Sequence, residues 1–183
     1  MRGLPAFRMA PSDGVVRLRE WRPADAADMT AACRDPEVAR WTMVPDDYRE
    51  ADARAFIAGR DAARRAGEAL DAAVVDAVDG GLLGAVALTA LDWRHERAEV
   101  GYWVAPWARG RGVATRAVRL LAAWTFTHTE IGRLDLMTYI GNTASERVAE
   151  RAGFVREGVL RGFYLAKDGR RDVTMFGLLR PNA

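Results

Sequence analysis

The feature that most constrains the fold of this chain is a strand-like segment that runs through a proline into a turn rich in glycine and arginine, over residues 98–115. Val100, Tyr102 and Val104 occupy alternate positions, and valine and aromatic residues suit a pleated strand. Pro106 ends the strand, because proline has no N–H to donate to a neighbouring strand. A helical pattern follows, so the sequence predicts a strand, a short turn and a helix in immediate succession.

The turn between that strand and that helix reads Arg109-Gly110-Arg111-Gly112. Glycine allows the backbone to approach a ligand closely, and the first turn of a helix has N–H groups without intrahelical partners. These N–H groups and the helix dipole favour an anion, and the two arginines add positive charge. The turn therefore predicts a cradle for phosphate or pyrophosphate.

Two common phosphate loops do not fit this spacing. A P-loop requires a lysine directly after its last glycine, but no lysine follows Gly112, and Lys167 is the only lysine of the chain. A dinucleotide-binding turn requires a third glycine where Thr115 stands, and its glycines follow the strand more closely than the seven residues of 105–111 allow. The loop therefore belongs to a different class of phosphate site.

Length and composition fit one globular domain. A chain of 183 residues, 50% hydrophobic and 28% charged, can bury about 70% of its unfolded surface. No apolar run is long enough to span a membrane. Residues 1–13 resemble a flexible N-terminal leader and lack the apolar core of a signal peptide, which leaves residues 14–183 as a single domain. Cys33 is the only cysteine, so no internal disulfide can form and a cytoplasmic location is expected.

The net charge of +2 is distributed unevenly. Residues 1–104 hold 14 arginines and 18 acids, a charge of −4, whereas residues 105–183 hold 13 basic residues and 7 acids, a charge of +6. A basic half that contains the phosphate loop suits a polyanionic cofactor, although solvated arginine-rich helices would give the same count. The basic residues form no dense run, which argues against nucleic acid as a partner.

The order of predicted elements indicates an α+β fold. Alternation of apolar and polar residues predicts strands at 15–21, 70–78, 82–93, 95–104, 134–140, 154–165 and 171–179. Periodicity and capping residues predict helices at 23–34, 35–41, 49–67, 112–128 and 142–153. The last of these is capped by Asn142 or by a Thr143/Glu146 box. We expect a mixed, mostly antiparallel central sheet flanked by helices, with one parallel pair of strands at its centre.

This order, together with several strings, resembles the GNAT superfamily and within it the RimJ/RimL-type N-acetyltransferases. Arg109-x-x-Gly112-x-Ala114 fits the acetyl-CoA loop of that superfamily, [Q/R]-x-x-G-x-[G/A], and has the expected strand before it and helix after it. The resemblance extends over most of the domain, up to Phe154. It is carried further by the strings L-R-E-W-R-P-A-D, D-P-E-V-A-R-W, A-E-V-G-Y-W-V and N-T-A-S-E-R-V-A-E-R-A-G-F.

The resemblance implies transfer of an acetyl group from acetyl-CoA to a primary amine by direct attack in a ternary complex. It implies a bulge that splays the strand before the loop from the next parallel strand, and Ala105-Pro106 lies where that bulge is expected. Pantetheine would enter the gap and pair with the strand edge at Tyr102, Trp103 and Val104. The pyrophosphate would lie on the amides of Arg109, Gly110, Arg111, Gly112, Val113 and Ala114.

Two residues are candidates for the chemistry. The resemblance assigns Glu99 the role of base for the amine, whereas the simpler alternative is an ion pair with Arg97 on the same face of the strand. Many GNAT enzymes place a tyrosine acid where this chain has Ala149, and the subgroup with N-x-x-S uses the serine, here Ser145. The alternative for Ser145 is a hydroxyl that merely starts a helix. Asn142 is expected to cap that helix and, secondarily, to contact pantetheine.

The acceptor amine would bind between the loop that follows Trp41 and the final hairpin near Tyr164, where Asp46 and Asp47 could attract a cation. A protein N-terminal α-amine is the expected acceptor, with small-molecule amines as the alternative. A CoA-binding module without catalysis, and an arginine-rich interaction protein that binds no CoA, are hypotheses of other classes. A homodimer is one candidate assembly. His95 and His128 have no partners at metal-ligand spacing, so we expect no metal site.

Overall fold

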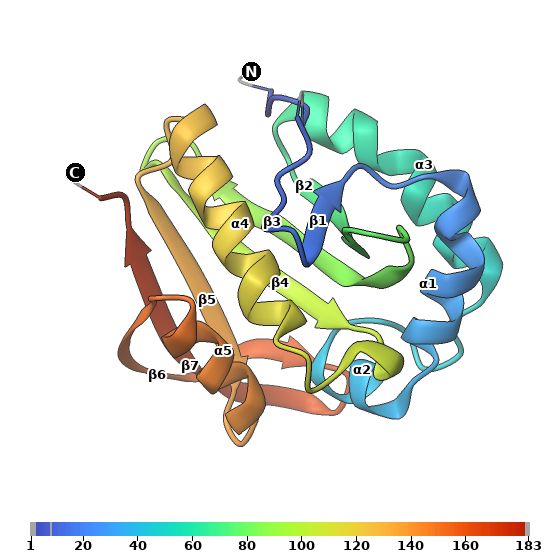
Figure 1. Ribbon diagram of the computed structural model, residues 1–183. Coiled ribbons are helices and arrows are strands. Elements are labelled where there is room, and N and C mark those ends of the chain that lie inside the picture. Colours follow the sequence, from blue (N-terminus) through green and yellow to red (C-terminus); the bar gives the residue numbers. More distant parts are fainter. Residues whose placement is uncertain (1–2, 8, 182–183) are drawn as a thin grey trace.

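One mixed sheet of seven strands forms the centre of the molecule, in the order β1-β2-β3-β4-β5-β7-β6 (Figure 1). The structure is a computed structural model that describes residues 3–7 and 9–181. The strands are β1 (Val16–Arg19), β2 (Leu70–Asp76), β3 (Leu82–Asp92), β4 (Arg97–Val104), β5 (Arg133–Tyr139), β6 (Val155–Ala166) and β7 (Gly169–Leu179). The helices are α1 (Ala26–Cys33), α2 (Pro36–Trp41), α3 (Glu50–Ala66), α4 (Val113–His128) and α5 (Thr143–Arg151), with short 3₁₀ turns η1 (Pro23–Asp25) and η2 (Pro106–Ala108).

The predicted α+β class and the order of elements are confirmed, and the element ends agree with the sequence prediction to within two residues, except that residues 23–25 form the 3₁₀ turn η1 and α1 begins at Ala26. Local chemistry explains several of these ends. Asp35 caps α2 by accepting from two backbone N–H groups, and Asn142 caps α5 by accepting from the N–H of Ser145 at 3.1 Å. Gly67 ends α3 in the left-handed conformation, with φ of 73°. Of the two caps that the sequence allowed for α5, the structure therefore has Asn142.

The central parallel pair is short. Strand β4 pairs with β5 only at Arg97↔Arg133, Ala98↔Leu134 and Glu99↔Asp135. Beyond Glu99 the two strands diverge (Figure 1), while β4 continues along β3 as far as Val104 and β5 continues along β7 as far as Tyr139. The predicted splayed pair is therefore present, and each of its strands is held from its outer side.

The splay does not arise from a bulge at Ala105-Pro106, so that prediction was wrong. The register of β3 with β4 is unbroken from Gly84↔Val104 to Thr89↔Glu99, and Ala105 extends it by donating to the carbonyl of Leu83 at 2.9 Å. The register shifts at the other end of the pair, between Thr89 and Asp92 on β3. Pro106 then starts a 3₁₀ turn, so β4 simply ends where proline removes the donor.

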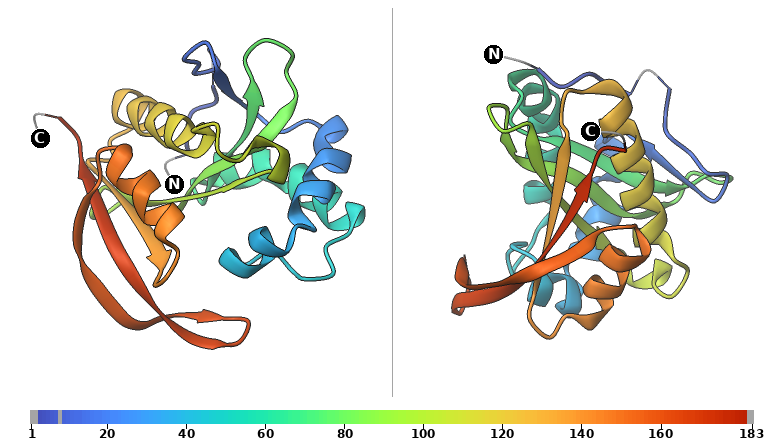
Figure 2. Two further views of the ribbon diagram at one scale, coloured as in Figure 1. Left: turned by 60° about the horizontal axis from the view of Figure 1, so that its bottom comes forward. Right: turned by 90° about the vertical axis from the view of Figure 1, so that its left-hand side faces the viewer.

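Two hydrophobic clusters lie on opposite faces of the sheet. Strand β2 contributes to both clusters, because it is buried on both sides. Leu70, Ala72 and Val74 pack in the cluster that includes α4, whereas Ala73 and Val75 pack in the cluster that includes α1 and α3. Helices α4 and α5 therefore cover one face and α1 and α3 the other (Figures 1 and 2). No helix among residues 3–7 and 9–181 combines the length and apolarity needed to cross a membrane.

Residues 3–7 pack on the domain, whereas the sequence suggested a flexible leader over residues 1–13. Leu4 is only 2% exposed and exchanges hydrogen bonds with Arg64, through its N–H at 3.0 Å and its carbonyl at 2.8 Å. The ring of Phe7 contacts Trp124 of α4 edge-on, with centroids 4.8 Å apart. Burial of these apolar side chains holds residues 3–7 against the domain. Residues 1, 2 and 8 of the predicted leader lie outside the described residues.

Gly84 on β3 leaves room for the end of β4, and this yields a test. A Cβ at Gly84 would overlap the carbonyl oxygen of Trp103 and lie 3.1 Å from the Cα of Val104, whereas a Cβ at Gly101 meets nothing within 4 Å. We expect Gly84→Ala to lower the free energy of unfolding by about 1–3 kcal/mol, because backbone must shift. Gly101→Ala should leave it unchanged or raise it by up to about 1 kcal/mol. Urea unfolding measures both, and equal losses would contradict the close approach.

Candidate active site

The two sides of β4 present different chemistry because successive side chains of a strand point to opposite faces. The hydroxyl of Tyr102 lies 2.7 Å from the hydroxyl of Ser145 on α5. Trp103 points the other way and stacks on Trp21, with centroids 6.4 Å apart, in the cluster of α1 and α3. Glu99 has the same parity as Trp103. The gap between β4 and β5 is therefore flanked by Tyr102 and Ser145 on one face and by Glu99 on the other.

The turn after β4 has the geometry of an anion site. Gly110 and Gly112 have φ of 74° and 72°, and no atom lies within 4 Å of a Cβ built on either. Gly112 is the N-cap of α4 and no side chain caps that helix, so its first N–H groups remain available. Val113 is buried beneath the turn and anchors it to the core. The amides predicted to hold a pyrophosphate thus lie in the turn before a 16-residue helix and in its first turn, which no side chain caps.

The two arginines of the turn pair with carboxylates on other elements. Arg109 binds Asp35, the N-cap of α2, at 2.5 Å, and Arg111 lies 3.5 Å from Asp76 at the end of β2. The hydrogen bond from Arg109 holds the pKa of Asp35 below its ordinary value. Because both guanidinium groups pair with carboxylates, the predicted anion site consists of backbone amides, and the two arginines lie at its edge.

Sequence reasoning missed a basic hollow of about 600 Å³ that opens beside Gly112. Arginines at 116, 119 and 151 line it, together with Asp13, Thr115, Leu120 and Ala123. Arg116 pairs with Asp13 at 2.6 Å. The sequence does contain a signal for this hollow, because Arg116 and Arg119 are three residues apart and therefore share one face of the helix. A second phosphate group of a ligand held at Gly112 would fit this hollow.

Tyr102 and Ser145 form a half-buried hydroxyl pair on the face of the sheet that α4 and α5 cover. Burial raises the pKa of Tyr102 to about 12, although the hydrogen bond with Ser145 opposes the shift. The helix is capped by the Asn142 side chain, so the Ser145 hydroxyl is not used as a cap. Ser145 lies in the first turn of α5 and its hydroxyl contacts Tyr102, so both its proposed catalytic role and the alternative of a helix-start hydroxyl stay open. Of the predicted residues, the structure brings Tyr102, Asn142 and Ser145 together.

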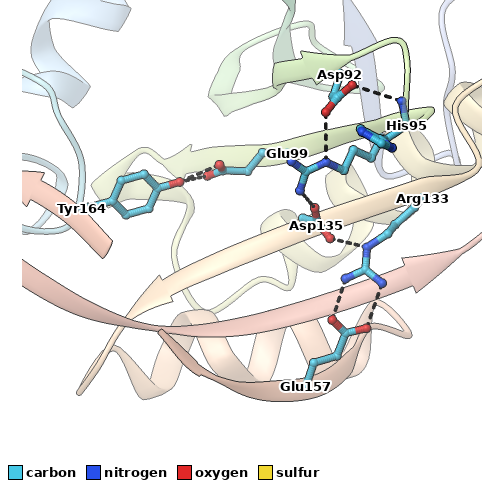
Figure 3. Close-up of polar contacts among 8 residues, drawn as sticks. Asp92, His95, Glu99, Arg133, Asp135, Glu157 and Tyr164 are labelled. Atoms are coloured by element: carbon cyan, nitrogen blue, oxygen red, sulfur yellow. Dashed lines mark hydrogen bonds and ion pairs between the residues drawn. The ribbon is translucent and has the colours of Figure 1, made fainter. Parts of the chain in front are cut away.

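Glu99 pairs with Tyr164 on the opposite face. The Tyr164 hydroxyl lies 2.6 Å from both carboxylate oxygens of Glu99 (Figure 3). Burial raises the pKa of the Glu99 carboxyl, the Tyr164 hydrogen bond opposes that rise, and the nearby charge of Asp135 adds to it. Burial and the Glu99 carboxylate also raise the pKa of Tyr164. Tyr164, predicted only as an acceptor-site residue, is thus the direct partner of the predicted base.

The ion pair of Glu99 with Arg97 that the sequence allowed is absent among the described contacts. Arg97 lies 3.5 Å from Asp92 and 3.5 Å from the buried Asp135. Arg133 binds Asp135 at 2.7 Å and Glu157 at 2.6 Å, so a chain of ion pairs joins β3, β4, β5 and β6 (Figure 3). This chain lies where β4 and β5 are still paired, so it fastens the closed end of the gap.

The other predicted acceptor residues have partners of their own. Asp46 binds Lys167 at 2.6 Å, and Lys167 also donates to the carbonyl of Ala39 at 3.0 Å. Asp47 lies 3.6 Å from Arg49. The indole N–H of Trp41 donates to Glu37 at 3.0 Å. The lysine therefore ties the β6–β7 turn to α2 and the loop after it.

Neither histidine belongs to a ligand set. The backbone N–H of His95 donates to Asp92 at 3.1 Å, and the ring of His128 stacks on Trp124. Within the described ranges, no three His, Cys, Asp or Glu side chains gather as a metal site.

Comparisons with known proteins identify the family of the chain. The acetyltransferase (GNAT) domain matches residues 16–155. Ribosomal-protein-serine acetyltransferase of Escherichia coli (strain K12) is 27% identical over 95 residues, 52% of this chain and 53% of that protein. Spermidine N(1)-acetyltransferase of the same strain is 30% identical over 98 residues, 53% of each. The chain thus spans about half the length of these two relatives.

Among solved structures, the ribosomal L7/L12 alpha-N-protein acetyltransferase RimL in complex with coenzyme A superposes with a TM-score of 0.82. The superposition covers 92% of this chain and 96% of that one at 18% identity, so it shows the fold. The family match covers well over half of the chain. The chain therefore belongs to the GNAT family of N-acetyltransferases, and ribosomal-protein acetyltransferases of the RimJ/RimL type are among its relatives.

Proposed function

We propose that this chain transfers an acetyl group from acetyl-CoA to the α-amine at a protein or peptide N-terminus. The observation that carries the proposal is the gap between β4 and β5, with a carboxylate on one face, a hydroxyl pair on the other and an uncapped helix N-terminus beyond it. An amine can approach from the Glu99 face while the sulfur leaves towards Ser145. The resemblance to ribosomal-protein-serine acetyltransferase supports a protein acceptor.

Acetyl-CoA would supply the thioester, and the residues present fit its chemistry. The amides from Gly110 to Ala114 can hold the pyrophosphate, and the hollow with its three arginines can hold the 3′-phosphate. The edge of β4 from Tyr102 to Val104 can pair with the amides of pantetheine, because β5 has left it. Asn142 points its amide oxygen at Ser145 N–H, so its proposed contact with pantetheine would use the remaining amide nitrogen.

Glu99 would act as the base for the amine, directly or through water. A peptide α-amine has a pKa of about 7.7–8.0, so a substantial part is already neutral near pH 7.5. A carboxylate whose pKa is raised above its ordinary value is a better proton acceptor than an exposed one. Tyr164 holds the carboxylate in place from the other side.

Ser145 would stabilise the departing sulfur. Its hydroxyl can donate a hydrogen bond or a proton to the thiolate, and Tyr102 can donate in turn to Ser145, so the pair shares the charge that develops. Ala149 leaves no tyrosine at the position that many GNAT enzymes use. The proton of the amine thus goes to the Glu99 side and the negative charge of the sulfur to the Ser145 side.

A polyamine is the second candidate acceptor, favoured by the resemblance to spermidine N(1)-acetyltransferase. A primary aliphatic amine with a pKa of about 10.4 is almost wholly charged at neutral pH, so its deprotonation costs about 4 kcal/mol more at pH 7.5 than for an amine that is already neutral. Asp46 and Asp47 could attract such a cation only by exchanging Lys167 and Arg49 for it. A polyamine would thus have to compete with these two side chains and also pay the higher cost of deprotonation, so we propose the α-amine as the acceptor.

The first test is binding and transfer with defined ligands. CoA and acetyl-CoA should raise the Tm of the wild type, and a screen of N-terminal peptides and polyamines with a thiol reagent should identify the acceptor. Gly112→Val should abolish the rise in Tm, because a side chain at Gly112 covers the amides.

The matched control for that test is Gly80→Val. Gly80 has a similar φ of 79° and equally open surroundings, so the two variants share the backbone strain. Gly80→Val should keep the CoA-dependent rise. A full rise in folded Gly112→Val would contradict the assigned cofactor loop, and binding without acetylation of any amine would indicate a CoA-binding module.

The second prediction concerns the leaving sulfur. Ser145→Ala should lower kcat by about 10- to 1,000-fold and leave acetyl-CoA affinity nearly unchanged, as expected of a group used in the transition state. Tyr102→Phe should lower kcat by less, because Ser145 can still donate. Steady-state kinetics together with a binding isotherm separate the two effects. Unchanged kcat in Ser145→Ala would exclude this role.

The third prediction is the pH dependence. The base must be deprotonated, and its pKa lies above the ordinary value, so kcat/KM should fall on the acid side of a raised Glu99 pKa. Tyr164→Phe removes the hydrogen bond that lowers this pKa, so the acid limb should move to higher pH. Glu99→Gln should lose at most about 100-fold on a good α-amine peptide, and the loss should shrink towards pH 9.

Profiles of kcat/KM against pH for wild type, Tyr164→Phe and Glu99→Gln provide the measurement. Parallel profiles without recovery at high pH would assign Glu99 a structural or positioning role.

A further inference from the structure

One buried hydroxyl near the gap has no hydrogen-bond partner. Four buried side-chain N or O atoms lack partners within residues 3–7 and 9–181, and two are the Nε atoms of Arg64 and Arg180, whose guanidinium groups bond elsewhere. The third is the Trp21 indole N–H, enclosed among rings of the opposite cluster. The fourth is the Oγ1 of Thr138, a residue only 2% exposed. An unpaired buried hydroxyl is costly, so it points to a missing partner.

Thr138 lies on the part of β5 that has left β4. Pairing of the two strands ends at Asp135, three residues earlier. Thr138 has the same parity as Leu134 and Leu136, which pack in the cluster of α4. Its hydroxyl therefore belongs to the cofactor face, the face on which Tyr102 meets Ser145.

The cross-strand neighbour of Thr138 confirms this direction and supplies a contrast. Thr174 on β7 is paired with Thr138, is equally buried at 1% exposure, and has its hydroxyl 3.0 Å from a carboxylate oxygen of Glu146. Glu146 follows Ser145 on α5. Thr138 and Thr174 thus lie side by side on neighbouring strands and differ in one respect. The hydroxyl of Thr174 has a hydrogen-bond partner within the protein, and the hydroxyl of Thr138, which is nearer the gap, has none.

We infer that Thr138 binds the pantetheine arm of CoA, with its hydroxyl hydrogen-bonded to an amide group of that arm. The inference rests on the proposed use of acetyl-CoA. The arm carries two amides and would pass between β4 and β5, so it brings hydrogen-bonding groups to a buried wall that offers one unpaired hydroxyl. Thr138 would then hold the arm from the β5 side, opposite the β4 edge.

The test compares Thr138→Val with Thr174→Val, which remove one hydroxyl each at nearly constant volume. Without ligand, Thr138→Val should raise the Tm by about 2–4 °C because an unpaired buried group is lost, whereas Thr174→Val should lower it because Glu146 loses its partner. With CoA, Thr138→Val should bind about 3- to 10-fold more weakly, the size of one hydrogen bond, and Thr174→Val should bind as the wild type does.

Three probes separate the parts of the ligand. CoA and acetyl-CoA should be weakened equally by Thr138→Val, and adenosine 3′,5′-bisphosphate, which lacks the arm, should bind unchanged. Thr138→Ser retains the hydroxyl and should restore CoA affinity.

Unchanged CoA affinity in Thr138→Val, or an equal loss for adenosine 3′,5′-bisphosphate, would overturn the inference. A loss for acetyl-CoA alone would overturn the amide assignment in favour of the thioester. If CoA binds to no variant and not to the wild type, the proposed function itself fails.

Discussion

The parting of β4 from β5 after Glu99 is the constraint on which the rest of the site depends. Backbone groups of neighbouring strands normally satisfy each other, and leaving them unpaired costs as much as lost hydrogen bonds. The gap persists because β3 holds β4 as far as Val104 and β7 holds β5 as far as Tyr139. At the closed end, the ion pairs around Asp135 fasten the two strands together. The sheet thus keeps a slot into which an extended ligand with its own amides can fit.

Strand alternation then divides the chemistry between the two faces. Because side chains alternate along β4, Glu99 at an odd position points towards the C-terminal hairpin and Tyr102 at an even position points towards α5. Direct transfer to an amine needs this separation, because the proton leaves the nucleophile at one end of the reacting group while charge develops on the sulfur at the other. Residues only three apart in sequence therefore lie on opposite faces of the sheet, as the proposed direct transfer requires.

The carboxylates of the site are tuned by their surroundings in opposite directions. Burial raises the pKa of Glu99, whose hydrogen-bond partner is a neutral phenol, whereas the Arg133 hydrogen bond lowers the pKa of Glu157. A base benefits from a raised pKa, and an ion-pair partner benefits from a lowered one. Among the described residues, five arginines in the second half of the chain form ion pairs. The N-terminus of α4 has no side-chain cap, which leaves its amides for the proposed cofactor phosphate.

The sequence by itself determined the elements, their order, the phosphate turn and the identity of Glu99 and Ser145 as candidates. These follow from local rules: strand alternation, proline and glycine at element ends, and a side-chain cap at Asn142. The tertiary structure alone decided which residues meet. Tyr164 reaches Glu99 across 65 positions of sequence, Lys167 binds Asp46, and Leu4 and Phe7 pack on α3 and α4. Such contacts depend on how the sheet twists and where its strands part, and no local pattern in the sequence encodes that geometry.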